Sequence, residues 1–236
     1  MIFTPLLVPI LLILFLCFVF FNMHYNMVKE KEKQKNITDN LRQYAKRNNY
    51  KFHNIYPQNM LMLSEIFNEG YNIEVKNVVY KSEKNYDIIW GDHFYTTGHG
   101  RNMQIHQCSF VIIKCLYVSF PQFYMRDEEM IIDYLGKLLG GQDINFDGDD
   151  YFSHAFVLQG DSEKDIRRFF TRKIRSAFTS CLAKGGYRVC SNNHSFVIHQ
   201  ERQIDNIEAR LELEKKAKRI IKTILYEHAQ IDDDAR

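Results

Sequence analysis

Apolar and polar residues divide the chain into two unlike parts. From Ile2 to Phe21 every residue is uncharged and almost all are apolar, without the polar face of an amphipathic helix. At about 1.5 Å per residue, a helix of this length spans roughly 30 Å, the hydrocarbon thickness of a bilayer. After residue 37 the apolar residues recur instead with the periods of strands and amphipathic helices. The pattern predicts one transmembrane helix followed by a folded domain.

Two other interpretations of the apolar segment fit its sequence less well. A secretory signal peptide has a basic start, a shorter apolar core and a small-residue cleavage site. Here no charged side chain precedes the apolar run, and Phe20-Phe21-Asn22-Met23 offers no such site. A buried core helix rarely stays free of charge on all sides for twenty residues. We therefore expect residues 1–28 to remain as a membrane anchor that contacts the lipid bilayer through residues 2–21.

The charges that flank the anchor predict its orientation. Only the terminal amine precedes the apolar run, whereas Lys29, Lys31, Lys33 and Lys35 follow it in a charged neck, residues 29–37. Lysine and arginine near a membrane helix stay on the cytoplasmic side, and acidic residues contribute little to this rule. The domain, residues 38–236, is therefore predicted to be cytoplasmic. Five cysteines without a C-x-x-C motif agree with a reducing compartment.

Alternation of apolar and polar residues predicts several strands in the first half of the domain. Strands are expected around Ile73–Val79 and Tyr86–Trp90, and then from Gln104 to Val118. The last of these contains Phe110-Val111-Ile112-Ile113, an unbroken apolar run typical of a strand covered on both faces. Thr97-Gly98-His99-Gly100 is predicted to form the turn before it.

Helix signals frame and follow these strands. Thr38 is expected to cap a short helix, Pro57 to open a helix over Gln58–Phe67 that Gly70 stops, and Asp127 to start a helix that Gly140-Gly141 ends. A single helix is predicted over residues 162–182, because its apolar residues form one continuous face: Ile166, Phe169, Phe170, Ile174, Ala177, Phe178 and Leu182.

The C-terminal third adds strands and a last helix. His154–Leu158 is predicted to be a strand, and Ser191-Asn192-Asn193-His194 to be the turn of a hairpin. The last helix is expected from about Asp205 to His228. Its C-terminal half is expected to dock on the domain, and its charged first half to face solvent or a partner helix. The predicted class is α+β, a mostly antiparallel sheet with packed helices behind one N-terminal transmembrane helix.

Basic residues line the face of the 162–182 helix that lies opposite its apolar face. Lys164, Arg168, Arg172 and Arg175 follow helical spacing. Such a stripe is most often a solvated surface. In a domain tethered to an anionic leaflet, however, each Lys or Arg near the surface contributes about 1 kcal/mol of attraction. Contact of these four residues with anionic lipid head groups is therefore the leading functional interpretation, and a membrane protein partner is the other.

An acidic segment resembles half of a calcium loop. Asp143 to Gly148 matches D-x-N-x-D-G, but His154 stands where the loop needs a bidentate glutamate. We expect an acidic connecting turn with Ile144 and Phe146 packed inward. No metal site is predicted either for the hairpin histidines, because their spacings fit no known zinc or copper motif and they are expected to be exposed: His93, His99 and His106, with Cys108 beside them.

Motifs that would identify an enzyme are absent from the sequence. It contains no G-x-S-x-G, P-loop or H-E-x-x-H pattern, so no catalytic residue is assigned and no cofactor is expected. A net charge of +2, without an RNA- or zinc-finger pattern, gives no reason to expect a nucleic-acid partner. Hydrophobic residues, 45% of the chain, suffice for one folded core.

A broader pattern resembles a loose group of uncharacterised bacterial membrane-anchored proteins. It comprises the N-terminal apolar helix and a series of short motifs: Tyr44-Ala45-x-x-Asn48-x-Tyr50, Asn77-Val78-Val79, Gly91-Asp92-His93-x-Tyr95, Phe120-Pro121-x-Phe123-x-x-Arg126, and Asp143-Ile144-x-Phe146 followed by Phe152-Ser153-x-x-Phe156. The similarity covers roughly residues 40 to 200. It implies a single-pass protein of the bacterial inner membrane, without an established activity. We expect a binding or scaffold module at the inner membrane surface; the alternative is a membrane-tethered enzyme with an unrecognised active site.

Overall fold

The computed structural model describes residues 4–56, 70–128 and 143–234. The chain separates into two compact units, Met1–Asn40 and Leu41–Arg236, which are described one at a time. An N-terminal apolar helix precedes an eight-stranded antiparallel sheet with packed helices. The predicted α+β class is therefore confirmed.

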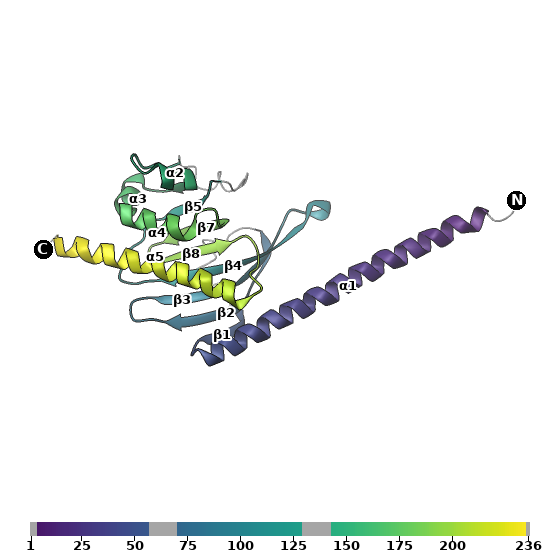
Figure 1. The fold of residues 1–236 in the computed structure, drawn as a ribbon. Helices are drawn as coiled ribbons and strands as arrows, with labels where there is room; N and C mark the ends of the chain where they lie inside the picture. Colours follow the sequence, from purple (N-terminus) through teal and green to yellow (C-terminus); the bar gives the residue numbers. More distant parts are fainter. Residues whose placement is uncertain (1–3, 57–69, 129–142, 235–236) are drawn as a thin grey trace. The chain divides into compact units, whose positions relative to one another are not determined.

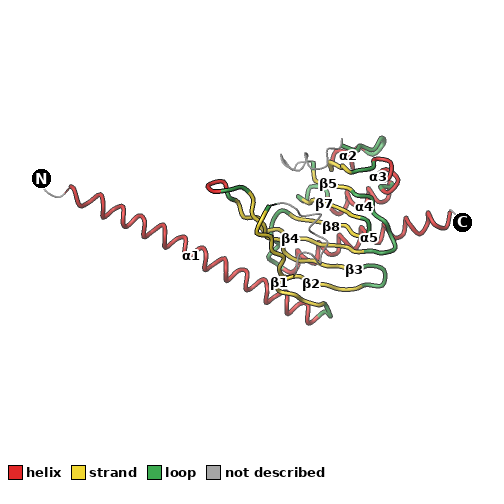
Figure 2. The backbone as a smooth tube through the Cα atoms, turned by 180° about the vertical axis from the view of Figure 1, so that it is seen from behind, coloured by secondary structure: helices red, strands yellow, loops and turns green. Residues whose placement is uncertain are grey.

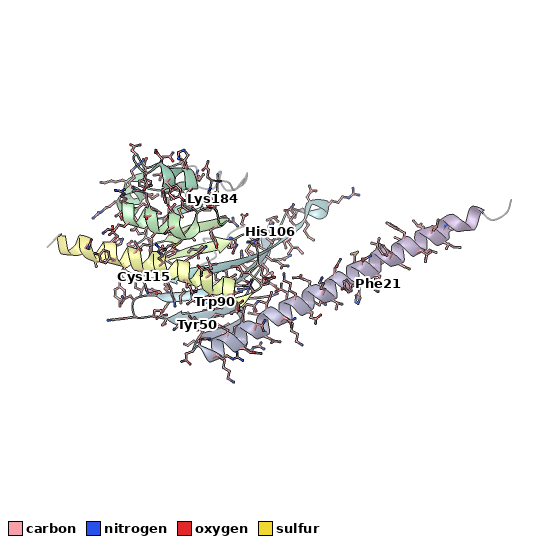
Figure 3. All side chains as sticks on the ribbon, in the orientation of Figure 1. Phe21, Tyr50, Trp90, His106, Cys115 and Lys184 are labelled. Atoms are coloured by element: carbon pink, nitrogen blue, oxygen red, sulfur yellow. The ribbon has the colours of Figure 1, made fainter. Side chains whose placement is uncertain are left out.

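Helix α1 (Thr4–Arg47) makes up the described part of the first unit and ends in the second. It is uninterrupted because no glycine or proline lies between Ile10 and Arg47. The expected short helix capped by Thr38 is wrong: the Thr38 hydroxyl donates to the Gln34 carbonyl, 2.9 Å away, inside the longer helix. From Pro9 onward α1 is long and apolar enough to cross a membrane. Most of its apolar side chains between Ile10 and Val28 are exposed, and Phe21 (Figure 3) is 70% exposed.

The second unit is built on one antiparallel sheet with the strand order β1-β2-β3-β4-β8-β7-β5-β6. Its strands are β1 (Lys51–Tyr56), β2 (Tyr71–Ser82), β3 (Asp87–Thr97), β4 (Gln104–Lys114), β5 (Phe123–Asp127), β6 (Phe156–Gly160), β7 (Tyr187–Asn192) and β8 (Ser195–Gln200). The predicted strands over β2, β3 and β4 and the β7–β8 hairpin are confirmed. Gly98 lies in the predicted turn at φ +71°, before the short 3-10 helix η2 (Gly100–Asn102).

Two predictions in the middle of the chain differ from the structure. Asp127 is the last residue of β5, and its two carboxylate oxygens accept the backbone N–H groups of Lys184 and Gly186. Residues 154–155, predicted to open a strand, belong instead to helix α2 (Asp150–Ala155), and the strand begins at Phe156. The expected helix over Gln58–Phe67, and the stretch with Gly140-Gly141 that should follow Asp127, lie outside the described residues.

Helices α4 (Arg172–Leu182) and α5 (Ile207–Asp234) lie on one face of the sheet, in front of it in Figure 1 and behind it in Figure 2. The predicted single helix over 162–182 is wrong, because α3 (Glu163–Phe169) ends before α4 begins. Thr171 caps α4 through its side chain, which accepts the N–H of Ile174. The break buries the consecutive Phe169 and Phe170 together, whereas one helix would point them about 100° apart.

A buried ion pair joins α5 to the sheet. Asp92 of β3 is 0% exposed and accepts two hydrogen bonds from the Arg210 guanidinium, at 2.8 and 3.0 Å. Asn77, Ser109 and Gln203 donate to the same carboxylate at 2.8–3.1 Å, so Asp92 is fully satisfied. The charged first half of α5 therefore docks on the domain, which corrects the expectation that it faces solvent or a partner helix.

A second polar contact lies one turn further along α5. Glu214, 4% exposed, accepts the Tyr50 hydroxyl at 2.7 Å and pairs with Lys218 at 2.8 Å. Tyr50 packs edge-on against Trp90, with ring centroids 6.5 Å apart (Figure 3). Burial, and then the Glu214 hydrogen bond, raises the pKa of the Tyr50 phenol well above its ordinary value of 10. These charges follow Arg210 at helical spacing, so one face of α5 carries both its ionic and its apolar contacts.

Candidate functional site

A basic groove runs between α4 and α5. It consists of two hollows that share Lys173, Arg219 and Thr223. The larger hollow has a volume of about 650 Å³ and is lined by Lys173, Lys215, Lys218, Arg219, Lys222, Thr223 and Tyr226. The smaller one, the α4 hollow, has a volume of about 370 Å³ and is lined by Arg172, Lys173, Ser176, Ala177, Ser180, Arg219 and Thr223. No carboxylate or imidazole lines either hollow, so the groove is a cationic surface.

The cations of the groove differ in how far acidic neighbours neutralise them. Lys173 pairs with Glu227 at 2.8 Å, and Lys218 pairs with both Glu214 and Glu83. Arg172, Arg219 and Lys222 are exposed and have no ion pair within the described part of the chain. These three residues therefore give the groove its uncompensated positive charge.

Glu227 of α5 binds two residues at the start of α4, beside the groove. Its carboxylate accepts the Thr171 hydroxyl at 2.7 Å and the Lys173 ammonium at 2.8 Å. The hydrogen bond from Lys173, followed by that from Thr171, lowers the pKa of Glu227 below its ordinary value. Lys173 also lies over the Tyr226 ring, 5.1 Å from its centroid. The contacts of Glu227 and Tyr226 with Thr171 and Lys173 therefore hold α4 and α5 together beside Arg172.

The predicted basic stripe is distributed over two helices. Lys164 and Arg168 lie exposed on α3, and Arg172 lies exposed on α4 at the groove. Arg175 instead binds partners inside the domain. Its guanidinium donates to Asp149 and to the Phe170 carbonyl at 2.6 Å each, and its side chain is 13% exposed. The structure therefore brings only Arg172 of the four to the groove.

Arg175 also holds the acidic turn, residues 143–149, against the domain. Its guanidinium covers the Phe146 ring at 4.3 Å and pairs with Asp149, which caps α2 by accepting the Phe152 N–H. Asp143 accepts the N–H of Leu158 at 2.9 Å. Ile144 and Phe146 are 5% and 7% exposed, so the predicted inward packing of this acidic turn is confirmed.

The histidines of the β3–β4 hairpin lie in different environments. His93 is 1% exposed and stacks on Tyr95, which in turn stacks on His106 at 4.5 Å. The expectation that all of them are exposed is therefore wrong for His93, since it faces the same side of the sheet as buried His199, 6.1 Å away between ring centroids. Within the described ranges, no group of three His, Cys, Asp or Glu side chains converges on a metal position.

His93 should make the stability of the domain depend on pH. Burial, and then the nearby Arg188 charge, lowers the pKa of His93 to about 4, and burial also lowers that of His199. Between pH 6.5 and 4 the unfolded chain binds a proton at His93 that the folded chain does not bind. We expect the free energy of unfolding to fall by about 2 kcal/mol from this group between pH 7 and pH 5.

Urea unfolding at both pH values measures this effect. His93→Gln should lose less stability than the wild type on acidification, by about that amount. Exposed His53→Gln is the control and should keep the wild-type pH dependence. A His93→Gln variant with an unchanged pH dependence would contradict the assignment.

The residues that α5 contributes to the groove were not predicted from the sequence. Lys215, Arg219 and Lys222 follow spacings of four and three residues, the signal of one helical face. The sequence does not show that this face lies beside Arg172, because the two helices are separated by the β7–β8 hairpin. Contact between α4 and α5 comes from the fold alone.

Comparison with known proteins shows a similarity of fold. No protein-family model matches the chain, and no curated protein matches its sequence. Among solved structures, the crystal structure of the mycobacterial trehalose monomycolate transport factor A, TtfA, is similar, with a TM-score of 0.55 and 8% sequence identity. The match covers 80% of this chain and 94% of the TtfA chain. At this identity the similarity concerns the fold.

Proposed function

We propose that this protein is a single-pass membrane protein whose domain is a binding or scaffold module at the cytoplasmic surface of the bacterial inner membrane. The basic groove between α4 and α5 is the observation that carries this proposal. Three of its cations have no acidic partner in the described chain, and each Lys or Arg close to an anionic leaflet contributes about 1 kcal/mol of attraction. Anionic lipid head groups are the proposed ligand.

The anchor strengthens this binding by keeping the groove close to the membrane. A tethered module meets its ligand at an effective concentration in the millimolar range, so individually weak contacts suffice. TtfA, the protein of similar fold, is named a trehalose monomycolate transport factor. A membrane-associated scaffold or transport-related role is compatible with that name.

The alternative of a membrane-tethered enzyme has less support. Carboxylates and imidazoles, the commonest general acids and bases, do not line the groove, and the hydrogen bond to Glu227 raises the pKa of Lys173, which keeps this lysine protonated. The buried His93 and His199 are 1% and 0% exposed, so in this conformation a substrate does not reach them. The proposed role is therefore binding.

Cosedimentation of the domain, residues 38–236, with vesicles tests the proposal. The domain should bind vesicles that contain phosphatidylglycerol and not vesicles of phosphatidylcholine alone. Binding should fade as added salt shortens the Debye length from about 10 Å at 0.1 M to about 3 Å at 1 M. A triple variant, Arg172→Gln, Arg219→Gln and Lys222→Gln, should lose most of this binding.

Matched variants separate the groove from general positive charge. The control replaces three exposed cations outside the groove, Lys84, Arg101 and Arg202, with glutamine and removes the same charge. It should bind nearly as well as the wild type. A double variant, Lys164→Gln and Arg168→Gln, reports whether the α3 part of the predicted stripe contributes. Equal loss in the groove and control variants, or equal binding to neutral vesicles, would refute the groove as the site.

A further inference from the structure

Within the basic groove, we propose that the α4 hollow is a site for a phosphomonoester. This inference rests on the proposed function, because it names the chemical group that the groove selects among anions. The hollow is lined by two arginines, one lysine and three hydroxyl side chains on neighbouring turns of α4 and α5. Six of its seven lining residues carry a hydrogen-bond donor, whereas attraction of an anion by charge alone needs no hydroxyl groups.

The two arginines supply the geometry for recognition of a phosphate. Arg172 comes from the first turn of α4 and Arg219 from the middle of α5, so each wall of the hollow contributes one arginine to its lining. A guanidinium presents N–H donors in a rigid fork that matches two oxygens of one anion. Neither arginine has an ion pair within the described residues, so both forks are available to a ligand.

Hydroxyl groups complete the set of donors. Ser176 and Ser180 follow Arg172 along α4, and Thr223 follows Arg219 along α5. The hydroxyls of Ser180 and Thr223 donate to carbonyl groups of their own helices, which a rotation about χ1 exchanges for a ligand oxygen. The N-terminus of α4, an eleven-residue helix, adds the positive end of its dipole beside Arg172.

The charge of the hollow favours a monoester over a diester or a carboxylate. A phosphomonoester carries about −1.5 to −2 charge near neutral pH and presents three terminal oxygens. A phosphodiester or carboxylate carries one charge and presents two oxygens, which a single arginine fork satisfies. Two forks, with Lys222 lining the adjoining larger hollow, match the larger charge and the third oxygen.

The hollow is also preorganised. Glu227 holds Thr171 and Lys173 at 2.7 and 2.8 Å, and Ile174, Phe178 and Leu182 bury the opposite face of α4. The backbone that positions Arg172 is therefore fixed before a ligand arrives. A preorganised site loses less conformational entropy on binding.

Titration of the full-length protein in micelles of a neutral detergent tests this inference. The probes are short-chain phosphatidic acid, a monoester, and short-chain phosphatidylglycerol, a diester, with calorimetry as the readout. Phosphatidic acid should bind at least about tenfold more tightly. This preference for phosphatidic acid should persist when twice as much phosphatidylglycerol is added, so that both lipids supply the same total negative charge.

Two variants identify the arginine forks as the cause. Arg172→Lys with Arg219→Lys keeps the charge and removes both forks, so the preference should fall to about twofold or less while phosphatidylglycerol binding is retained. The control, Arg101→Lys with Arg202→Lys, should keep the tenfold preference. Melting curves show that both variants remain folded.

Inorganic phosphate distinguishes the source of the ligand. Competition by phosphate at concentrations similar to phosphatidic acid supports a soluble phosphomonoester, and competition only at much higher concentrations supports a lipid head group. Equal affinity for the two lipids, or a preference that survives in the double lysine variant, overturns this inference and leaves the proposed function standing. Absence of binding to either lipid overturns both.

Discussion

Asp92→Ala is expected to lower the free energy of unfolding by about 3–5 kcal/mol. The variant leaves the Arg210 guanidinium, 3% exposed, buried without its counter-charge. It also removes the acceptor of Asn77, Ser109 and Gln203. An unpaired buried charge costs far more free energy than a lost surface contact, so the packing of α5 on the sheet is weakened. Urea unfolding of the domain measures the change.

Two further variants separate the charge from the packing. Arg210→Met in the Asp92→Ala background removes the orphaned charge and should recover part of the lost stability, because replacement of both partners of a buried pair is often near neutral. Asp87→Ala, in the same strand with an exposed contact to Ser82, should cost less than about 1 kcal/mol. A loss below about 1 kcal/mol for Asp92→Ala would contradict the role given to the ion pair.

Introduction of two arginines into the apolar part of α1, Leu12→Arg with Leu14→Arg, is expected to move the full-length protein from the membrane to the soluble or aggregated fraction. Each arginine at the centre of a membrane helix costs about 2.5–3.5 kcal/mol on insertion scales. The wild type and a Leu12→Ala, Leu14→Ala control should remain in the membrane pellet after a carbonate wash. A wild-type protein that washes off, or a mature N-terminus near residue 24, would refute the anchor.

The same protein tests the proposed orientation. A reporter fused after Arg236 should be active in the cytoplasm alone, since the four lysines of the neck follow the apolar run. Replacement of Lys29, Lys31, Lys33 and Lys35 with glutamine should produce a mixed population. A periplasmic reporter signal from the wild type would reverse the topology and remove the cytoplasmic leaflet as the source of anionic lipid.

Elements governed by local periodicity were predictable from the sequence. The apolar run, the strands β2 to β4, the β7–β8 hairpin and the last helix each follow from the spacing of apolar residues and from turn residues beside them. Among the helix signals, the single helix over residues 162–182 and the cap at Thr38 failed. Thr38 resembles a helix cap, yet it lies inside α1, because continuation of an existing helix forms one hydrogen bond per residue without a new nucleus.

The candidate site was only partly visible in the sequence. Arg172 was identified on its basic helix, but Arg175 on the same helix is bound to Asp149 and the ring of Phe146. Periodicity shows which face of a helix is polar, and it does not show which charged side chain meets a partner from another segment. Arg219 and Lys222 became part of the site only because α5 packs beside α4.

The sequence by itself determined the long apolar helix, the α+β class and the position of most strands, because these depend on residues close together in the chain. The tertiary structure alone decided which charges are buried and which face solvent. Asp92 and Arg210 are 118 residues apart, and the walls of the groove come from two helices separated by a hairpin. A charge is stable in the interior only beside a partner, and the fold decides which distant residues become partners.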